Sequence, residues 1–255
     1  MPGLLGIVWL LIWRVSYHAP EDHPRLGDEE RRLILADREQ GRLTLGNVRW
    51  RALLKLPSTW GIVLGRSLTD PVWYFIADWF GVFIASKHVR LEQGLMSFWI
   101  PFLAADLGNF LGGGVSSWLI RRGWNVLRAR KAVIVVCGVG MTFLIPVVFT
   151  SNLPLILALF SISTCCYAAW STMALTLPSD LYPDAWVGSV SGISGAGSGV
   201  GTIISTILIG WTADRYAFGP VLVGASLVPL LATALVLILV RAPDSPSRPA
   251  GAVAR

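Results

Sequence analysis

Charged side chains inside long apolar segments are the residues of this sequence best placed to do chemistry. Arg66, Asp70 and Asp78 lie in the apolar segment 58–86. Arg66 and Asp70 are four residues apart, so on a helix they share one face and can pair. Because ionisable groups inside a bilayer are costly to bury, such groups are candidates for function. The pair fits a structural contact that locks this segment to a neighbour, and it also fits a substrate-facing or gating pair.

Pro71 follows Asp70 and removes one backbone hydrogen bond near the middle of the same segment. Secondary transporters place their substrate sites at broken helices of this depth. Trp73 and Tyr74 lie beside the proline, where lining a cavity and simple packing explain them equally well. Asp78 lies nearer the outer end of the segment, where we expect a carboxylate that faces water at the opening of the bundle rather than one that relays protons.

Polar residues also interrupt two later apolar segments. Asp106 lies near the middle of one of them, and Asn109 follows one helical turn later. A carboxylate at that depth must face water, a partner group or a proton. The segment 154–177 ends in a polar patch that contains Trp170 and Ser171. The hydroxyl groups of this patch either bond back to the preceding turn or contact a substrate.

Stripes of small residues mark the segments 95–120 and 187–212. The second stripe includes Ser194 and Ser198 among several glycines. Small residues let helices approach closely, so tight packing explains both stripes. A helix contact that moves during transport needs the same residues, and both serines are therefore also candidates to contact a substrate.

The sequence contains no motif of nucleotide-driven or hydrolytic chemistry. The patterns GxxxxGK[ST], HExxH and GxSxG are all absent. Cys137, Cys165 and Cys166 lie in apolar runs without CxxC spacing, so packing explains them. The sequence therefore gives no support for an enzyme, a metal site or a cofactor.

The composition indicates what kind of fold must position these residues. Only 14% of the 255 residues are charged and 54% are hydrophobic, whereas a soluble domain carries about 25% charged residues. A helix needs about 20 apolar residues to cross a bilayer and satisfies its own backbone there. We therefore expect an all-α membrane protein with a six-helix transmembrane bundle. The expected spans are 58–86, 95–120, 132–150, 154–177, 187–212 and 219–240.

The basic residues fix the expected orientation of this bundle. Seventeen of the 21 Lys and Arg residues lie on one side, in 14–57, in the loop 121–131 and in 241–255. Cytoplasmic loops are rich in Lys and Arg, so we expect these three stretches in the cytoplasm. The net charge of +6 therefore needs no nucleic acid as a partner.

The same reading divides the chain into four parts. Residues 1–13 are apolar but short, and we interpret them as the remnant of a preceding transmembrane helix. A cytoplasmic loop, 14–57, precedes the bundle, 58–240, and a cytoplasmic tail, 241–255, follows it. The loop contains a helix start near Asp28, for a helix that lies on the membrane surface or binds a partner. The six spans form two successive triplets of opposite orientation, which is an inverted repeat.

Several motifs combine these residues in a recognisable order. They are YHAPEDHPRL at 17–26, RSLTDPVWY at 66–74, WIPFLAADLG at 99–108, RRGWNVLRARK at 121–131 and SDLYP at 179–183. Together they resemble the hexuronate-transporter branch of the anion:cation symporter family, in the major facilitator superfamily. The resemblance covers nearly the whole chain. It implies that the bundle is half of a major facilitator fold, matching the end of the sixth helix through the twelfth.

The resemblance also implies roles for particular residues. The family's proton-coupling acids and carboxylate-binding arginines lie largely in the N-terminal half, so none is carried over. The matching candidates to line the central cavity are Trp73, Tyr74, Trp170, Ser171, Ser194 and Ser198. The basic loop corresponds to a cytoplasmic gate, in which Arg121, Arg122, Arg130 and Lys131 would contact acidic groups or helix ends.

These observations predict the C-terminal half of a secondary transporter in a bacterial inner membrane. Its substrate would be a small organic anion such as a hexuronate, carried by alternating access and coupled to a cation or proton. Its partners would be the lipid bilayer, that anion, and an N-terminal six-helix half or a second copy. The isolated chain is expected not to transport. The alternative is a non-transporting assembly or sensory subunit that binds a partner through 14–57.

Overall fold

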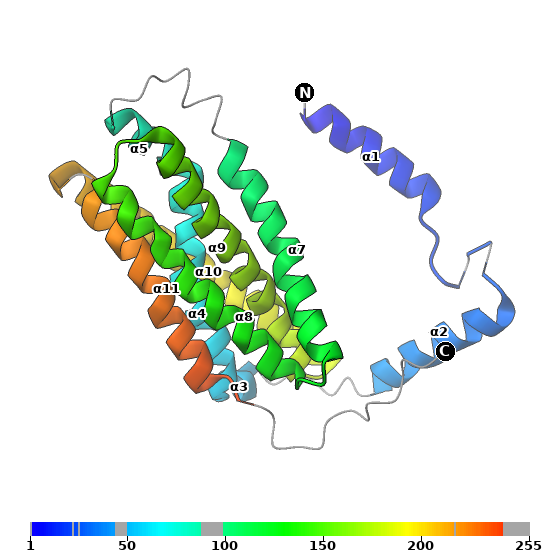
Figure 1. The fold of residues 1–255 in the computed structure, drawn as a ribbon. Helices are drawn as coiled ribbons and strands as arrows, with labels where there is room; N and C mark the ends of the chain where they lie inside the picture. The colour runs from blue at the N-terminus through cyan, green and yellow to red at the C-terminus, as the bar shows by residue number, and fades with distance from the viewer. Residues whose placement is uncertain are drawn as a thin grey trace. The chain divides into compact units, whose positions relative to one another are not determined.

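A computed structural model describes residues 2–21, 23–24, 26–43, 50–87, 99–216 and 218–241. The chain divides into two compact units, residues 1–48 and residues 49–255. Each unit is described by itself below, and the labels of the helices are those of Figure 1.

The first unit consists of two helices, α1 (Pro2–Ser16) and α2 (Asp28–Leu43). The first turn of α2 carries Asp28, Glu29 and Glu30. Their negative charges interact favourably with the positive, N-terminal end of the helix dipole. Arg31 pairs with Asp28 at 3.2 Å and donates to the carbonyl oxygen of His23, also at 3.2 Å. The predicted helix start at Asp28 is confirmed.

The second unit is a bundle of long helices that lie side by side (Figure 1). A short helix, α3 (Trp50–Leu53), precedes the bundle, and the described residues of the unit contain no strand. The long helices match the six expected spans, except that residues 95–98 of the span 95–120 lie outside the described residues. They are α4 (Pro57–Tyr74) with the π-helix η1 (Phe75–Trp79) and α5 (Phe80–Ser86), α7 (Trp99–Arg121), α8 (Val126–Gly140) with the 3-10 helix η2 (Met141–Phe149), α9 (Leu153–Leu181), α10 (Asp184–Tyr216) and α11 (Gly219–Leu239).

Four of these helical segments are long and apolar enough to cross a membrane, among the residues described. They are Val126–Phe149, Leu153–Leu181, Asp184–Tyr216 and Gly219–Leu239. The expected spans 58–86 and 95–120 are also helical, from Pro57 to Ser86 and from Trp99 to Arg121. The shorter of the two has 23 residues, a length of about 34 Å at 1.5 Å per residue. Both are long enough, but their charged residues make them more polar.

Two details of these helices differ from expectation. The basic loop was predicted over 121–131, and this prediction is too long. The helix α7 runs to Arg121 and α8 begins at Val126, so the connection between them is residues 122–125. Asn125 caps α8, since its side-chain oxygen accepts a bond from the backbone N–H of Leu127 at 2.9 Å. The helix also continues through Pro71, and the irregular π-helical turn begins four residues later at Phe75.

Glycines set the spacing between the central helices. A Cβ at Gly108 of α7 would overlap the backbone carbonyl of Cys165 on α9. Similarly, a Cβ at Gly201 of α10 would overlap the carbonyl of Ser67 on α4. Tight packing therefore explains these members of the small-residue stripes. Gly199 faces the other way, where a Cβ would have open space among the described residues.

Candidate substrate-binding site

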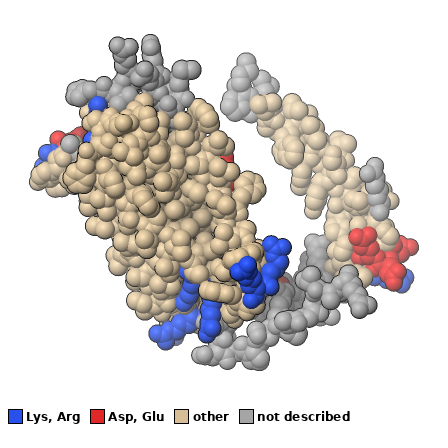
Figure 2. Space-filling model, in the orientation of Figure 1, with Lys and Arg blue, Asp and Glu red and all other residues tan. Residues whose placement is uncertain are grey.

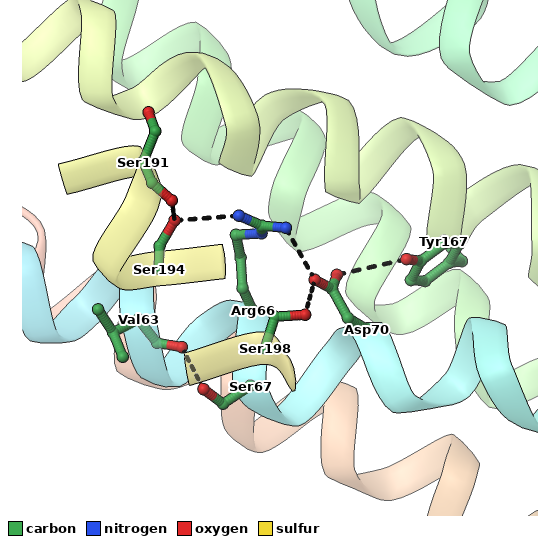
Figure 3. A network of polar contacts seen from close by, with 8 residues as sticks. All are labelled: Val63, Arg66, Ser67, Asp70, Tyr167, Ser191, Ser194 and Ser198. Atoms are coloured by element: carbon green, nitrogen blue, oxygen red, sulfur yellow. Dashed lines mark hydrogen bonds and ion pairs between the residues drawn. The ribbon is translucent and has the colours of Figure 1, made fainter. Parts of the chain in front are cut away.

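A network of polar contacts lies at the junction of α4, α9 and α10 (Figure 3). We call it the Arg66 cluster, and its members are Arg66, Asp70, Tyr167, Ser194 and Ser198. The Arg66 and Asp70 side chains form an ion pair, with Nη2 and Oδ2 3.1 Å apart. They are 15% and 7% exposed, so both charges are largely withdrawn from solvent.

Asp70 receives hydrogen bonds from three helices. Arg66, on the same helix, and Ser198, on α10, both donate to Oδ2. The Tyr167 hydroxyl, on α9, donates to Oδ1 at 3.3 Å. The carboxylate therefore has a donor on each oxygen, which offsets part of the cost of burying its charge.

Arg66 is less completely satisfied. Its Nη1 donates to Ser194 Oγ at 3.0 Å and its Nη2 donates to Asp70. Its Nε is buried and has no hydrogen-bond partner among the described residues. Since a guanidinium carries five N–H donors, this side chain retains capacity to bind a further acceptor.

The spacing of residues on α4 and α10 explains how the cluster forms. Arg66 and Asp70 are separated by four residues on α4, and Ser194 and Ser198 are separated by four residues on α10. Each pair therefore shares one helix face, so the two charged groups and the two hydroxyls meet in register. The close approach at Gly201 brings the two helices near enough for these contacts.

An aromatic group adjoins the polar cluster. The Tyr167 ring stacks on the indole of Trp73, with centroids 5.7 Å apart and planes inclined by 13°. Phe102, on α7, contacts the same indole edge-on with centroids 5.4 Å apart. Tyr167 therefore links the carboxylate of Asp70 to an aromatic surface. The sequence reading missed Tyr167 and Phe102, although Tyr167 lies one helical turn before Ser171.

The structure places Trp170, Asn109, Tyr74, Asp78 and Asp106 apart from this cluster. Trp170 is fully buried and donates from Nε1 to Thr233 Oγ1 of α11 at 3.0 Å. Asn109 accepts a bond from Thr172 Oγ1 at 2.8 Å, which joins α7 to α9. Ser171 is half-buried, and its side chain interacts with that of Tyr167, so this candidate adjoins the cluster. Tyr74, Asp78 and Asp106 are exposed.

The gate candidates lie near the basic end of the bundle. Figure 2 shows Lys and Arg side chains gathered there, beside a long surface with few charged side chains. Arg130 pairs with Asp180 at 3.1 Å and donates to Ser116 Oγ at 3.1 Å. Lys131 donates to the carbonyl oxygens of Leu237 and Val240, at 3.0 and 2.6 Å, at the C-terminal end of α11.

The remaining gate candidates are on the surface. Arg121 is exposed, and Arg122 lies over the Trp118 ring at 3.8 Å from its centroid. Nearby, the Tyr182 hydroxyl and Thr59 Oγ1 share a buried hydrogen bond of 2.8 Å. Burial raises the pKa of Tyr182 above its ordinary value.

The all-helical bundle, with four helical segments long and apolar enough to cross a membrane among the described residues, is that of an integral, multi-pass membrane protein. The sequence matches the family model described as "Major Facilitator Superfamily" over residues 1–206 and 128–255, and the chain belongs to this family. The predicted fold class is confirmed, because the helical bundle is consistent with half of a major facilitator fold.

The curated relatives include several sugar-acid transporters. The hexuronate transporter of Escherichia coli K12 is 28% identical over 233 residues, which cover 90% of this chain and 54% of that protein. The D-galactonate transporter of Escherichia coli O6:H1 is 28% identical over 253 residues, covering 93% and 57%. The galacturonate transporter of Dickeya chrysanthemi is 36% identical over 116 residues, covering 44% and 33%.

These matches confirm the predicted resemblance to the hexuronate-transporter branch. The chain spans about half the length of the hexuronate and D-galactonate transporters that it matches.

Proposed function

We propose that this chain acts as the C-terminal half of a secondary transporter for small organic anions, with sugar acids such as hexuronates as substrates. The bundle would move against a second six-helix bundle by alternating access, coupled to a cation or proton. The Arg66 cluster carries this proposal, because it combines a buried guanidinium, serine hydroxyls and an adjacent aromatic ring. The names of the relatives support the substrate class.

The chemistry of a sugar acid matches each part of this site. Its carboxylate would bind Arg66, whose planar fork of donors suits carboxylates and whose Nε has no partner within the described part of the chain. Its hydroxyls would contact Ser194 and Ser198. Its ring would lie against the half-buried indole of Trp73, an aromatic surface of the kind that binding sites use.

The outer face of α10 supports a second bundle as partner. Only 11% of its most apolar stretch is buried, although the helix is apolar enough to cross a membrane. A Cβ at Gly195 or Gly199 would meet no atom of the described residues, and Ile203 and Ile207 are exposed. We propose that an N-terminal six-helix half, or a second copy, packs on this face, since small residues allow close helix contact.

The basic residues complete this proposal as a cytoplasmic gate. Arg130 and Lys131 would hold α8 to the ends of α9 and α11 when the inside is closed, with Arg121 and Arg122 free to contact the second bundle. The same orientation puts 14–57 and 241–255 in the cytoplasm and the bundle in the inner membrane. The excess of Lys and Arg on one side supports this orientation.

Equilibrium binding tests the proposed ligand chemistry. The purified 255-residue chain in lipid nanodiscs would be titrated with D-glucuronate and with D-glucose, which differ by the carboxylate. We expect D-glucuronate to bind at least about tenfold more tightly, since the carboxylate makes charge-assisted bonds. Equal affinities would show that the site does not recognise the carboxylate.

The first unit favours a second candidate function. Residues 1–48 form a compact unit of their own, and α2 leaves Leu33 70% exposed. An assembly or sensory subunit could bind a partner through 14–57. Cross-linking that captures a soluble protein through this stretch, and is unchanged by substitution of Arg66, would favour that function.

A further inference from the structure

The carboxylate of Asp70 contacts the guanidinium of Arg66 in the way that the carboxylate of a bound ligand would. It approaches the guanidinium through one oxygen only, Oδ2 on Nη2, and leaves the neighbouring Nε without a partner among the described residues. Nε and Nη2 lie on the same edge of a guanidinium. A carboxylate that binds this edge with both oxygens makes the stronger bidentate contact. Both carboxylates would then lie at Nη2, where their negative charges repel each other, so binding of one disfavours the other.

We propose that Asp70 is the resident anion of the Arg66 site, which the substrate carboxylate displaces and which takes up a proton as it leaves. This inference rests on the proposed function in one respect, that the ligand is a carboxylate. Proton uptake would then be coupled to substrate binding at Asp70, a residue of this half, because the substrate carboxylate displaces the Asp70 carboxylate from Arg66.

The balance of charge in the cluster requires the proton. Arg66 and Asp70 together are neutral, and a second carboxylate would add a negative charge to a largely buried site. The other groups that face Asp70 bring no positive charge, since α9 supplies the Tyr167 phenol and α10 supplies the Ser198 hydroxyl. On α7, Asp106 is exposed, and it would add a negative charge if it turned inward. An uncompensated buried carboxylate is costly, so Asp70 would become neutral.

The contacts of Asp70 suit both of its protonation states. Hydroxyl groups donate to the carboxylate, and after rotation of the O–H bond they can accept from a carboxylic acid. Tyr167 and Ser198 can therefore serve Asp70 before and after it takes up a proton from solvent. The Asp70 carboxylate gains one proton for each substrate carboxylate bound, and no covalent bond other than this O–H changes.

The pH dependence of D-glucuronate binding tests this proposal. The full chain in nanodiscs would be titrated at several values between about pH 6 and 8.5, with proton uptake measured in weak buffer. If one proton binds with each ligand, the affinity for D-glucuronate falls about tenfold for each unit by which the pH is raised. Asp70→Asn should bind D-glucuronate with no such slope, more tightly than the unaltered chain at the highest pH, and with no proton uptake.

Two further variants make the result specific. Asp78→Asn is the matched control, because Asp78 is an exposed carboxylate two turns further along the same helical segment. It should keep the slope and the proton uptake of the unaltered chain. Tyr167→Phe removes one donor to Asp70 but keeps the ring that stacks on Trp73. It should bind severalfold more tightly at high pH, because Asp70 is held less firmly, while still taking up one proton.

Each other outcome overturns a defined claim. Equal slopes in the unaltered chain and Asp70→Asn, or no slope in either, would overturn the role of Asp70 and leave the proposed function standing. Failure of both proteins to bind D-glucuronate at any pH would overturn both claims, since a released Arg66 would then take no carboxylate. If Asp70→Asn does not fold, Tyr167→Phe decides, and unchanged affinity at high pH would contradict the proposal.

Discussion

Substitution of Gly201 by alanine tests whether the close approach of α10 to α4 builds the Arg66 cluster. A Cβ at this position would overlap the carbonyl carbon and oxygen of Ser67, which are backbone atoms and cannot rotate away. α10 must therefore move outward, and the contacts of Ser194 with Arg66 and of Ser198 with Asp70 would lengthen. The clash costs about 1–3 kcal/mol. Partial weakening of the two hydrogen bonds to charged groups adds about 1–2 kcal/mol in total, since the loss of one whole bond of this kind costs about 1.5–3 kcal/mol.

We therefore expect Gly201→Ala to lower the free energy of unfolding by about 2–5 kcal/mol. The control is Gly199→Ala on the same helix, where a Cβ meets open space. That substitution should leave stability unchanged or raise it by up to about 1 kcal/mol, because alanine favours helix over glycine. Reversible unfolding in mixed micelles, followed by helical circular dichroism, measures both. Equal stabilities of the two variants would refute the argument that this contact sets the helix spacing.

Three further predictions concern contacts outside the cluster. Arg130→Gln and Asp180→Asn should each destabilise the chain. Because the ion pair is only partly exposed, a double-mutant cycle of unfolding free energies should give a coupling energy of about 0.5–3 kcal/mol. Additive effects of the two substitutions would contradict this prediction. Lys131→Met should lower the unfolding free energy by about 0.5–1.5 kcal/mol, because the last carbonyls of α11 lose their donor; unchanged unfolding would mean that this contact contributes nothing. Trp170→Phe should cost at least about 1 kcal/mol in the same assay, through the bond lost to Thr233 and the smaller ring. A smaller cost in the Thr233→Val background would support the loss of that bond as a cause, and an equal cost would contradict it.

The parts of the fold that could be predicted from sequence are those that depend on local pattern. Apolar length and the scarcity of charge predicted the helical bundle, and the four-residue spacing of Arg66 and Asp70 predicted their pairing, which the 3.1 Å contact confirms. The start of α8 was missed because the basic residues after Asn125 resemble a loop by charge, although they are good helix formers.

The parts that could not be predicted depend on contacts between distant segments. Tyr167 lies 97 positions from Asp70 along the chain, so no spacing in either segment indicates their hydrogen bond. Trp170 and Ser171 are neighbours in sequence, but Trp170 lies against Thr233 in the core while Ser171 is half-buried. Successive residues of a helix point in different directions, and the packing of neighbouring helices decides which direction is buried.

The affinity of Arg66 variants for D-glucuronate tests the central claim most directly. Arg66→Gln keeps a planar polar side chain but removes the charge, and Arg215→Gln is the control, because Arg215 is an exposed arginine on α10. Isothermal titration of both variants in nanodiscs should show at least about tenfold weaker binding for Arg66→Gln, and unchanged binding for Arg215→Gln. Arg66→Lys, which keeps the charge without the bidentate fork, should fall between them. If D-glucuronate binds a folded Arg66→Gln variant as tightly as it binds the unaltered chain, the Arg66 cluster is not the carboxylate site.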